Sequence, residues 1–272
     1  MTPLAIFLDS HPALIHVAIA VAKGSTPREA GAFMLVSGNT LFGTIGGGQL
    51  EFIAIDHARR MLAGESMPDR LDIPLGPEIG QCCGGRTELV FSACNASLRE
   101  TLLMQESDER AARPQVWLFG AGHVGKALAA ALAPLPLTVM VVETRPEELT
   151  DLPPDTTAIA TPLPEAEIDR AAPGAAIVIL THDHALDFLI ATRALARHDL
   201  AYVGMIGSKS KRATFAHAFT AEGGDPAALD RLTLPIGGSA VRDKRPAVIA
   251  ALTAAEILTA LAAHQRGTSS GR

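Results

Sequence analysis

The stretch "VWLFGAGHVGKALAAALA", residues 116–133, decides the fold of the second half of this 272-residue chain. Its first four letters are a short apolar strand, and the alanine-rich letters after the glycines predict a helix. Gly120, Gly122 and Gly125 match the spacing G-x-G-x-x-G at this strand-to-helix turn. In that pattern the first glycine permits the turn, the second lets a phosphate approach the backbone, and the third lets the helix pack on the strand. The stretch therefore predicts a nucleotide-like ligand, unless the glycines serve strand–helix packing alone.

Two further residues belong to this candidate site. Glu143 ends the next apolar strand, 137–143, where an acid would accept a hydrogen bond from a ribose hydroxyl. His123 lies inside the glycine loop, where its ring can reach a bound ligand. A helix-capping or solvated histidine fits that position equally well.

The rest of this half continues the same alternation. Apolar strands are predicted over 175–180 and 201–207, with helical segments between several of them, and a closing helix over 245–263. Strands that alternate with helices imply parallel pairing and right-handed crossovers. We therefore expect a Rossmann-like parallel-sheet domain over residues 115–265 and a disordered tail over 266–272.

The N-terminal half has a mixed pattern. Strands are predicted over 13–22 and 32–37, then in "TLFGTI", "RLDIPLG" and "RTELVFSA", and an amphipathic helix follows the glycines of "GGGQLE". This pattern predicts an α+β domain over residues 1–108, with a linker over 109–114 inside a charged stretch that Pro114 closes. The fold class is α/β, with the α+β domain placed before the Rossmann-like one.

Bulk properties exclude several classes of protein. The net charge of -6 argues against a nucleic-acid partner, because binding phosphates requires a basic surface. Three cysteines are too few for a disulfide framework, so reduced thiols and a cytoplasmic location are expected. The first residues lack the basic region of a signal peptide. No apolar stretch was expected to approach the ~20 residues that span a bilayer, so no membrane partner is expected.

Two polar motifs follow predicted strands of the second half. In "LTHDHALDF", Thr181, His182, Asp183 and His184 lie at a strand end, where α/β sheets bind ligands. A metal site there requires a third ligand, for which Asp187 is the nearest candidate, whereas Thr181 or Asp183 as a helix cap is an equally good interpretation.

The second motif is "GSKSKR", residues 207–212. Its three cations would hold an anion or form a solvated helix start; they are Lys209, Lys211 and Arg212.

Three stretches of the N-terminal half carry more glycine than turns require: "KGSTPREAG" (23–31), "GTIGGGQLE" (43–51) and "GQCCGGRTE" (80–88). Successive N–H groups at the start of a helix can form an anion cradle, here over Gly46, Gly47 and Gly48. Glu51 would compete with a bound phosphate in that cradle. The arginines available to bind a phosphate in a bidentate manner are Arg28 and Arg86.

Six stretches follow one another along the chain: "KGSTPREAGAFMLV", "GTIGGGQLE", the Cys-Gly-Gly-Arg segment, "VWLFGAGHVGKAL", "THDHALD" and "MIGSKSKR". In this order they resemble the XdhC/CoxI family, the xanthine dehydrogenase accessory (maturation) proteins. The resemblance covers nearly the whole chain. It implies a non-catalytic chaperone that binds the molybdenum cofactor, a molybdopterin with a phosphate. The chaperone protects it while a cysteine desulfurase system installs the terminal sulfur, and then delivers it to xanthine dehydrogenase. A homodimer is expected, with one ligand cleft between the two domains.

Under this resemblance the cofactor-binding residues fall into two groups. The N-terminal group is Arg28, Gly46, Gly47, Gly48, Cys83, Gly84, Gly85 and Arg86, and the Rossmann group is Gly120, Gly122, His123, Gly125, Glu143 and His182. A thiolate beside flexible backbone and an arginine favours a soft metal, so Cys83 is expected to contact the molybdenum. Packing of both Cys82 and Cys83 is the alternative, and Cys94 is expected to pack only.

A second function remains open at this point. The Rossmann half by itself is compatible with an NAD(P)-dependent oxidoreductase. No separate catalytic domain follows that half, however, and no Tyr-x-x-x-Lys pair is present, since the only tyrosine is Tyr202 inside a predicted strand. We therefore expect an accessory protein and not an enzyme, with the molybdenum cofactor and not NAD(P) as the ligand.

Overall fold

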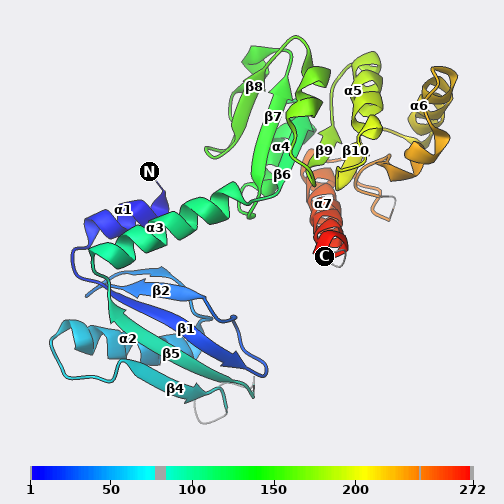
Figure 1. Ribbon diagram of the computed structural model, residues 1–272. Helices are drawn as coiled ribbons and strands as arrows, with labels where there is room; N and C mark the ends of the chain where they lie inside the picture. Colours follow the sequence, from blue (N-terminus) through cyan, green and yellow to red (C-terminus); the bar gives the residue numbers. More distant parts are fainter. Residues whose placement is uncertain (1, 77–83, 239, 270–272) are drawn as a thin grey trace. The chain divides into compact units, whose positions relative to one another are not determined.

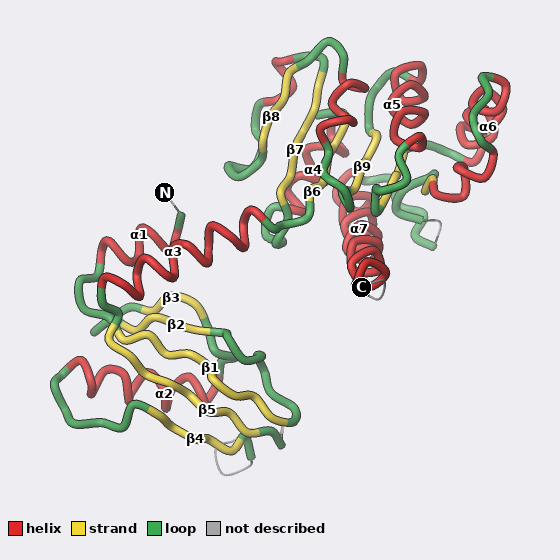
Figure 2. The backbone as a smooth tube through the Cα atoms, in the orientation of Figure 1, coloured by secondary structure: helices red, strands yellow, loops and turns green. Residues whose placement is uncertain are grey.

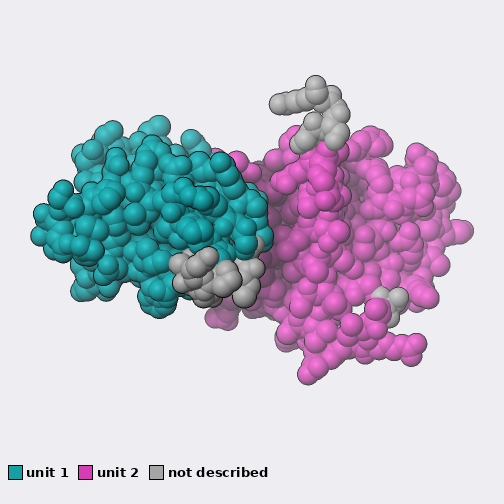
Figure 3. Space-filling view, turned by 90° about the horizontal axis from the view of Figure 1, so that it is seen from below, with its two compact units in different colours: residues 1–109 teal, residues 110–272 magenta. Residues whose placement is uncertain are grey.

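The computed structural model describes residues 2–76, 84–238 and 240–269, and the chain forms two compact units, Met1–Glu109 and Arg110–Arg272 (Figure 3). Each unit has its own sheet and its own hydrophobic core. Each is described by itself below.

The N-terminal unit is built on a five-stranded antiparallel sheet in the order β3-β2-β1-β5-β4 (Figure 1). The strands are β1 (Ile15–Lys23), β2 (Phe33–Val36), β3 (Leu41–Gly43), β4 (Arg70–Pro74) and β5 (Arg86–Ala93). One face packs against α2 (Gly48–Leu62), which buries Leu50, Ala54 and Ala58 over the sheet. A smaller core on the other side joins the sheet to α1 (Pro3–Ser10) and α3 (Ala96–Ala111) and contains Leu35 and Cys94.

The C-terminal unit is a parallel six-stranded sheet in the order β11-β10-β9-β6-β7-β8 (Figure 2). Its strands are β6 (Gln115–Phe119), β7 (Thr138–Glu143), β8 (Thr157–Ala160), β9 (Ala176–Ile179), β10 (Tyr202–Met205) and β11 (Leu232–Thr233). One face is covered by α4 (His123–Leu132) and α7 (Pro246–Ser269). The other is covered by α5 (His184–Ala196), α6 (Lys209–Ala221) and the 3₁₀ helices η3 (Pro164–Arg170) and η4 (Pro226–Arg231); η2 (Pro146–Leu149) follows β7.

The register of the parallel sheet brings distant motifs together. Phe119 of β6 pairs with Val142 of β7 on one side and with Ile179 of β9 on the other. The next residues along the chain, at 120, 143 and 180, therefore lie side by side at the carboxyl edge of the sheet. The mixed α/β architecture with a Rossmann-like second half confirms the predicted fold class.

Two boundaries differ from the predictions. Helix α3 continues to Ala111, so the charged stretch expected as a linker from residue 109 is still helical there. Its Glu, Arg and Ala residues favour a helix, which explains why charge alone was a poor sign of a linker. Helix α7 extends to Ser269, so residues 266–269 of the expected tail are helical as well.

The expectation that no apolar stretch approaches membrane-spanning length is wrong for α7. Residues 246–268 are long and apolar enough to cross a bilayer by length and composition, with a mean hydropathy of 1.8 over an 18-residue stretch. One face of this helix buries Ala250, Thr253, Ala254, Ile257 and Leu261 in the core of the C-terminal unit. Its apolar character comes from its alanines together with the larger aliphatic side chains Val248, Ile249, Leu252, Ile257, Leu258 and Leu261.

Candidate functional site

The glycine loop after β6 is tightly packed at two of its three glycines. A side chain on Gly120 would place its Cβ 2.5 Å from the carbonyl oxygen of Leu180. One on Gly125 would lie 2.0 Å from the carbonyl oxygen of Gly120. Both positions therefore exclude a side chain because strand and helix approach closely. Gly122, at the start of α4, has open space around it and no side-chain cap.

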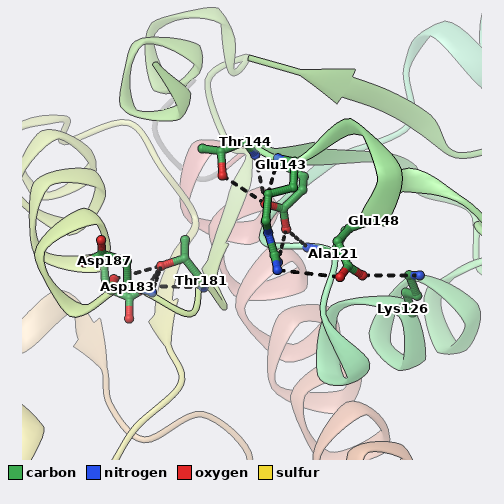
Figure 4. A network of polar contacts seen from close by, with 9 residues as sticks. Ala121, Lys126, Glu143, Thr144, Glu148, Thr181, Asp183 and Asp187 are labelled. Atoms are coloured by element: carbon green, nitrogen blue, oxygen red, sulfur yellow. Dashed lines mark hydrogen bonds and ion pairs between the residues drawn. The ribbon is translucent and has the colours of Figure 1, made fainter. Parts of the chain in front are cut away.

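Glu143 is held by its own chain (Figure 4). The side chain is 4% exposed, and its Oε2 accepts from the N–H of Ala121 (2.9 Å) and the guanidinium of Arg145 (3.2 Å). Its Oε1 accepts from the N–H and hydroxyl of Thr144 at 2.9 and 3.1 Å and from Arg145 at 3.2 Å. Burial raises the pKa of this carboxyl, but hydrogen bonds from Arg145 and from backbone N–H groups outweigh it and lower the pKa to about 2. A ribose hydroxyl would have to displace one of these donors.

The "THDHALD" and "GSKSKR" motifs meet through a buried ion pair. Asp187 is 1% exposed, and its carboxylate accepts from the hydroxyl of Thr181 (2.7 Å) and from the ammonium of Lys211. Lys211 also donates to the carbonyl oxygen of Ile206 at 2.9 Å. The two motifs come together because β9 and β10 are neighbours in the sheet.

The alternatives for the "THDHALD" motif are now distinguished. Asp183 caps α5 by accepting from the N–H groups of Ala185 (2.7 Å) and Leu186 (3.3 Å), as the helix-cap interpretation predicts. The carboxylate of Asp187 forms an ion pair with Lys211. The described residues contain no group of three or more His, Cys, Asp or Glu side chains that could hold a metal ion. His182 is exposed at the strand end, and His123 is exposed at the start of α4.

The cations of "GSKSKR" are mostly used within the fold. Besides Lys211, Arg212 donates to the carbonyl oxygens of Leu232 (2.7 Å) and Leu229 (3.1 Å). Lys209 is exposed and has no polar partner within the described parts of the chain. An anion at this strand end would therefore find one available cation of the expected three.

The crevice at the carboxyl edge of the parallel sheet is nearly filled. Its cavity measures about 10 Å³ and is lined by Gly120, Val142, Glu143, Thr144, Pro164, Thr181, His182 and Leu186. Pockets that hold small organic ligands measure about 300–1,000 Å³. This crevice has no room for a dinucleotide as it stands.

In the N-terminal unit the three glycine-rich stretches converge. A Cβ on Gly24 would lie 3.3 Å from the Cα of Gly85, and one on Gly85 would lie 2.2 Å from the carbonyl oxygen of Ser25. A Cβ on Gly46 would lie 2.6 Å from the Cβ of Pro27. The loop of residues 23–31 thus touches residues 84–85 and residue 46, and we call these three segments the glycine-loop cluster.

Glu51 occupies the anion cradle expected at Gly46, Gly47 and Gly48. Its carboxylate accepts from the hydroxyl of Thr44 and from the N–H of Ile45 (3.0 Å). Burial raises the pKa of Glu51. The hydrogen bonds from Thr44 and from the backbone N–H groups of residues 45–47 outweigh burial, so the pKa lies below its ordinary value. The backbone N–H groups therefore do form an anion cradle, and the anion that they bind is the carboxylate of Glu51.

The two candidate arginines differ. Arg86 forms a bidentate pair with Asp72, at 2.5 and 2.6 Å, although both side chains are more than half exposed. Arg28 is exposed beside Gly46 and has no polar partner among the described residues. Cys82 and Cys83 lie outside the described residues, directly before Gly84 of the cluster. Cys94 is buried in the smaller core, as expected.

Comparison with known proteins agrees with this geometry. The XdhC Rossmann domain matches residues 116–257, more than half of the chain, and the XdhC and CoxI family profile matches residues 8–72. The chain belongs to the XdhC and CoxI family. The family prediction made from the ordered motifs is thus confirmed. The two matches include the glycine loop after β6, both strand-end motifs and two segments of the glycine-loop cluster, while residues 80–88 lie between them.

Two individual proteins are similar to this chain. The uncharacterized protein YqeB of Escherichia coli K12 is 27% identical over 248 residues, which are 87% of this chain and 41% of that protein. The chain thus spans less than half of that relative. A crystal structure described as a xanthine dehydrogenase from Bacillus halodurans matches with a TM-score of 0.78 at 18% identity, over 96% of this chain and 95% of the other. At that identity the likeness concerns the fold.

Proposed function

We propose that this XdhC/CoxI-family chain carries the molybdenum cofactor during xanthine dehydrogenase maturation. In this role it binds the cofactor at the glycine-loop cluster, protects it during sulfuration by a cysteine desulfurase, and hands it to xanthine dehydrogenase. Membership of the family supports the maturation role. The molybdenum cofactor is the cargo of this protein, and the chain needs no catalytic residues to carry it.

The observation that supports this proposal most is the convergence of three loops beside Arg28, a cation with no polar partner among the described residues. Gly85 leaves no space for a side chain because the carbonyl oxygen of Ser25 lies against it, so the loops contact through their backbones. Arg28 projects from the central loop and is not neutralised by a carboxylate of the described chain. A guanidinium with free donors suits a phosphate monoester such as that of molybdopterin.

The residues of the cluster then take distinct roles. Arg28 would bind the phosphate, while Cys83, beside Gly84, would supply a soft sulfur ligand near the molybdenum. Arg86 is paired with Asp72 at the surface, where an ion pair contributes little and can be exchanged for another anion. Glu51 binds the backbone N–H groups of residues 45–47, so Arg28 is the group left to bind the phosphate.

Two observations disfavour the oxidoreductase alternative. Both oxygens of Glu143 are engaged by donors of the chain, so the acid expected for a ribose is occupied. The crevice beside it measures about 10 Å³. To bind a nicotinamide dinucleotide, the donors around Glu143 and the crevice beside it would both have to rearrange.

The test is to isolate the chain from a host that makes the cofactor. We expect a fluorescent oxidised pterin after acid treatment, together with molybdenum by mass spectrometry. Arg28→Gln and Cys83→Ser should lower the retained pterin about tenfold, since one lost charge-assisted contact corresponds to roughly 1.4 kcal/mol or more.

The matched control is Arg59→Gln, which removes an exposed charge of α2 in the same unit and should retain the cofactor as the unmodified chain does. Tight NAD(P) binding with substrate turnover, and no pterin, would establish the oxidoreductase instead. Equal pterin loss in Arg28→Gln and Arg59→Gln would remove the glycine-loop cluster from the proposal.

A further inference from the structure

A second concave site lies at the opposite end of the parallel sheet from the glycine loop. Its cavity measures about 390 Å³ and lies between residues 111–115, residues 172–174 and the last turns of α7. Gln115 begins β6, whereas the glycine loop follows Phe119 at the end of the same strand. The cavity therefore opens at the amino ends of β6 and β9, away from the glycine loop and the strand-end motifs of the same unit.

Three side chains that line this cavity have hydrogen-bond donors with no acceptor among the described residues. Arg113 is half-buried, and its guanidinium has no partner in the described part of the chain. The Oε1 of Gln115 accepts from the indole of Trp117 (3.0 Å) and the N–H of Ala172 (2.9 Å), which leaves its side-chain NH₂ to donate. The ring of His264 packs on Gly174, where an added Cβ would lie 3.2 Å from the ring.

No carboxylate is found among the residues that line the cavity. The nearest acid known to interact with His264 is Asp199, which is bound by Arg197 at 2.9 and 2.6 Å. The charge of Asp199 is thus neutralised by Arg197. The guanidinium of Arg113 carries a permanent positive charge, so the cavity is electropositive.

We propose that this cavity binds a small molecule bearing a phosphate or carboxylate group, held by Arg113, Gln115 and His264. Its volume falls in the range of about 300–1,000 Å³ that small-ligand pockets occupy. A planar guanidinium with a second donor alongside suits two oxygens of one anionic group. The site is independent of the proposed cofactor site, because its residues all belong to the other unit.

The experiment is calorimetric titration of the full chain with inorganic phosphate and, separately, with citrate, at constant ionic strength. We expect at least one probe to bind with a Kd in the millimolar range or tighter and to raise the melting temperature. The stronger probe identifies phosphate or carboxylate as the preferred group. Arg113→Gln should raise the Kd at least tenfold, and His264→Gln severalfold.

Arg110→Gln is the matched control, since it removes the same charge three residues earlier, from a side chain that pairs with Asp155 outside the cavity. It should leave the Kd within twofold. Melting curves without ligand check that Arg113→Gln and His264→Gln are folded. Absence of binding by both probes up to 10 mM, or equal weakening by Arg113→Gln and Arg110→Gln, would overturn the proposal.

Discussion

At the ends of the parallel strands, individual charged residues are bound by donors of their own chain. Glu143 accepts from Ala121, Thr144 and Arg145, and Asp187 accepts from Thr181 and Lys211. A buried carboxylate is stable only when its oxygens are hydrogen-bonded or paired. These residues therefore hold the strand ends together, and a ligand at this edge would depend on other groups.

Glu143→Gln should lower the free energy of unfolding by about 2–3 kcal/mol at neutral pH. The pKa of Glu143 is depressed to about 2 in the folded chain, so the charged form is bound more tightly there than in the unfolded chain. This stabilisation is complete above the unfolded pKa of about 4.5 and is lost as the pH falls toward 2. Urea unfolding from pH 7.5 to 3.5 should show the difference between the two chains shrinking. A difference that stays constant with pH would contradict this account.

The Asp187–Lys211 pair should behave as one unit. Removing either partner leaves an uncompensated buried charge, so Asp187→Asn and Lys211→Met should each cost about 3–5 kcal/mol. The double variant should cost clearly less than the sum of the two. A double-mutant cycle by chemical denaturation measures this coupling, and additive costs would mean that the two residues stabilise the fold separately.

At the scale of elements, the glycines separate into packing positions and open positions. Gly120 and Gly125 let α4 approach β6 and β9 closely, while Gly122 faces open space at the helix start. In the N-terminal unit Gly85 lets the loop of residues 23–31 lie against β5. Close packing thus explains part of the glycine pattern that first predicted ligand loops.

Gly125→Ala should therefore cost more than about 2 kcal/mol of stability, because its Cβ would lie 2.0 Å from a backbone oxygen that cannot move aside cheaply. Gly122→Ala is the matched control, with a backbone φ of -70° and no atom within 4 Å of the new Cβ. It should cost less than about 1 kcal/mol, the loss of a favourable N-cap residue. Thermal melts of both variants compare them directly. Equal costs would show that α4 does not depend on this close contact.

At the scale of the whole molecule, the chain consists of two units with separate cores. The antiparallel unit packs α2 on one side and α1 with α3 on the other, and the parallel unit packs two helical layers around its sheet. The proposed cofactor site and the proposed anion site fall in different units. The shared cleft, the homodimer and the cytoplasmic location remain predictions.

Each unit should fold by itself when the chain is divided between Glu109 and Arg110, near the end of α3. Each fragment contains a complete sheet with its helices, so circular dichroism and a cooperative melt should be retained in both. Phosphate or citrate binding should remain with residues 110–272, which contain the whole lining of the cavity. A fragment that unfolds, or binding that moves to residues 1–109, would contradict this division.

A homodimer should appear in light scattering of the full chain at tens of micromolar. Its physical basis is that a protein that carries a large, labile cargo benefits from covering exposed apolar surface, and symmetric pairs are the commonest way to do so. The exposed side chains of Phe52 and Met104, at 68% and 66%, are examples of such surface. A monomer at this concentration would count against the dimer.

The sequence by itself determined the five strands and α2 of the first half and four of the six strands of the second, because strand and helix periodicity and turn glycines are local properties. It did not predict α1, α3, β8 or β11. The stretch 116–133, the alternation after it and the order of the motifs were sufficient for the Rossmann-like unit and for the family. Local composition failed at the ends of two helices: the charged stretch expected as a linker is helical to Ala111 in α3, and α7 continues to Ser269 in the expected tail.

Only the tertiary structure decided which polar groups are free. Asp187 and Lys211 are 24 residues apart in sequence and meet because β9 and β10 are neighbours. Arg86 binds Asp72 of the neighbouring strand, and Glu143 accepts from Ala121, which follows the strand beside its own. Arg28 has no polar partner in the part of the chain that the structure describes. Such pairings depend on strand order and register, which long-range packing sets. For the same reason a cavity built from residues 111–115, 172–174 and the end of α7 has no signature in any single stretch of the chain.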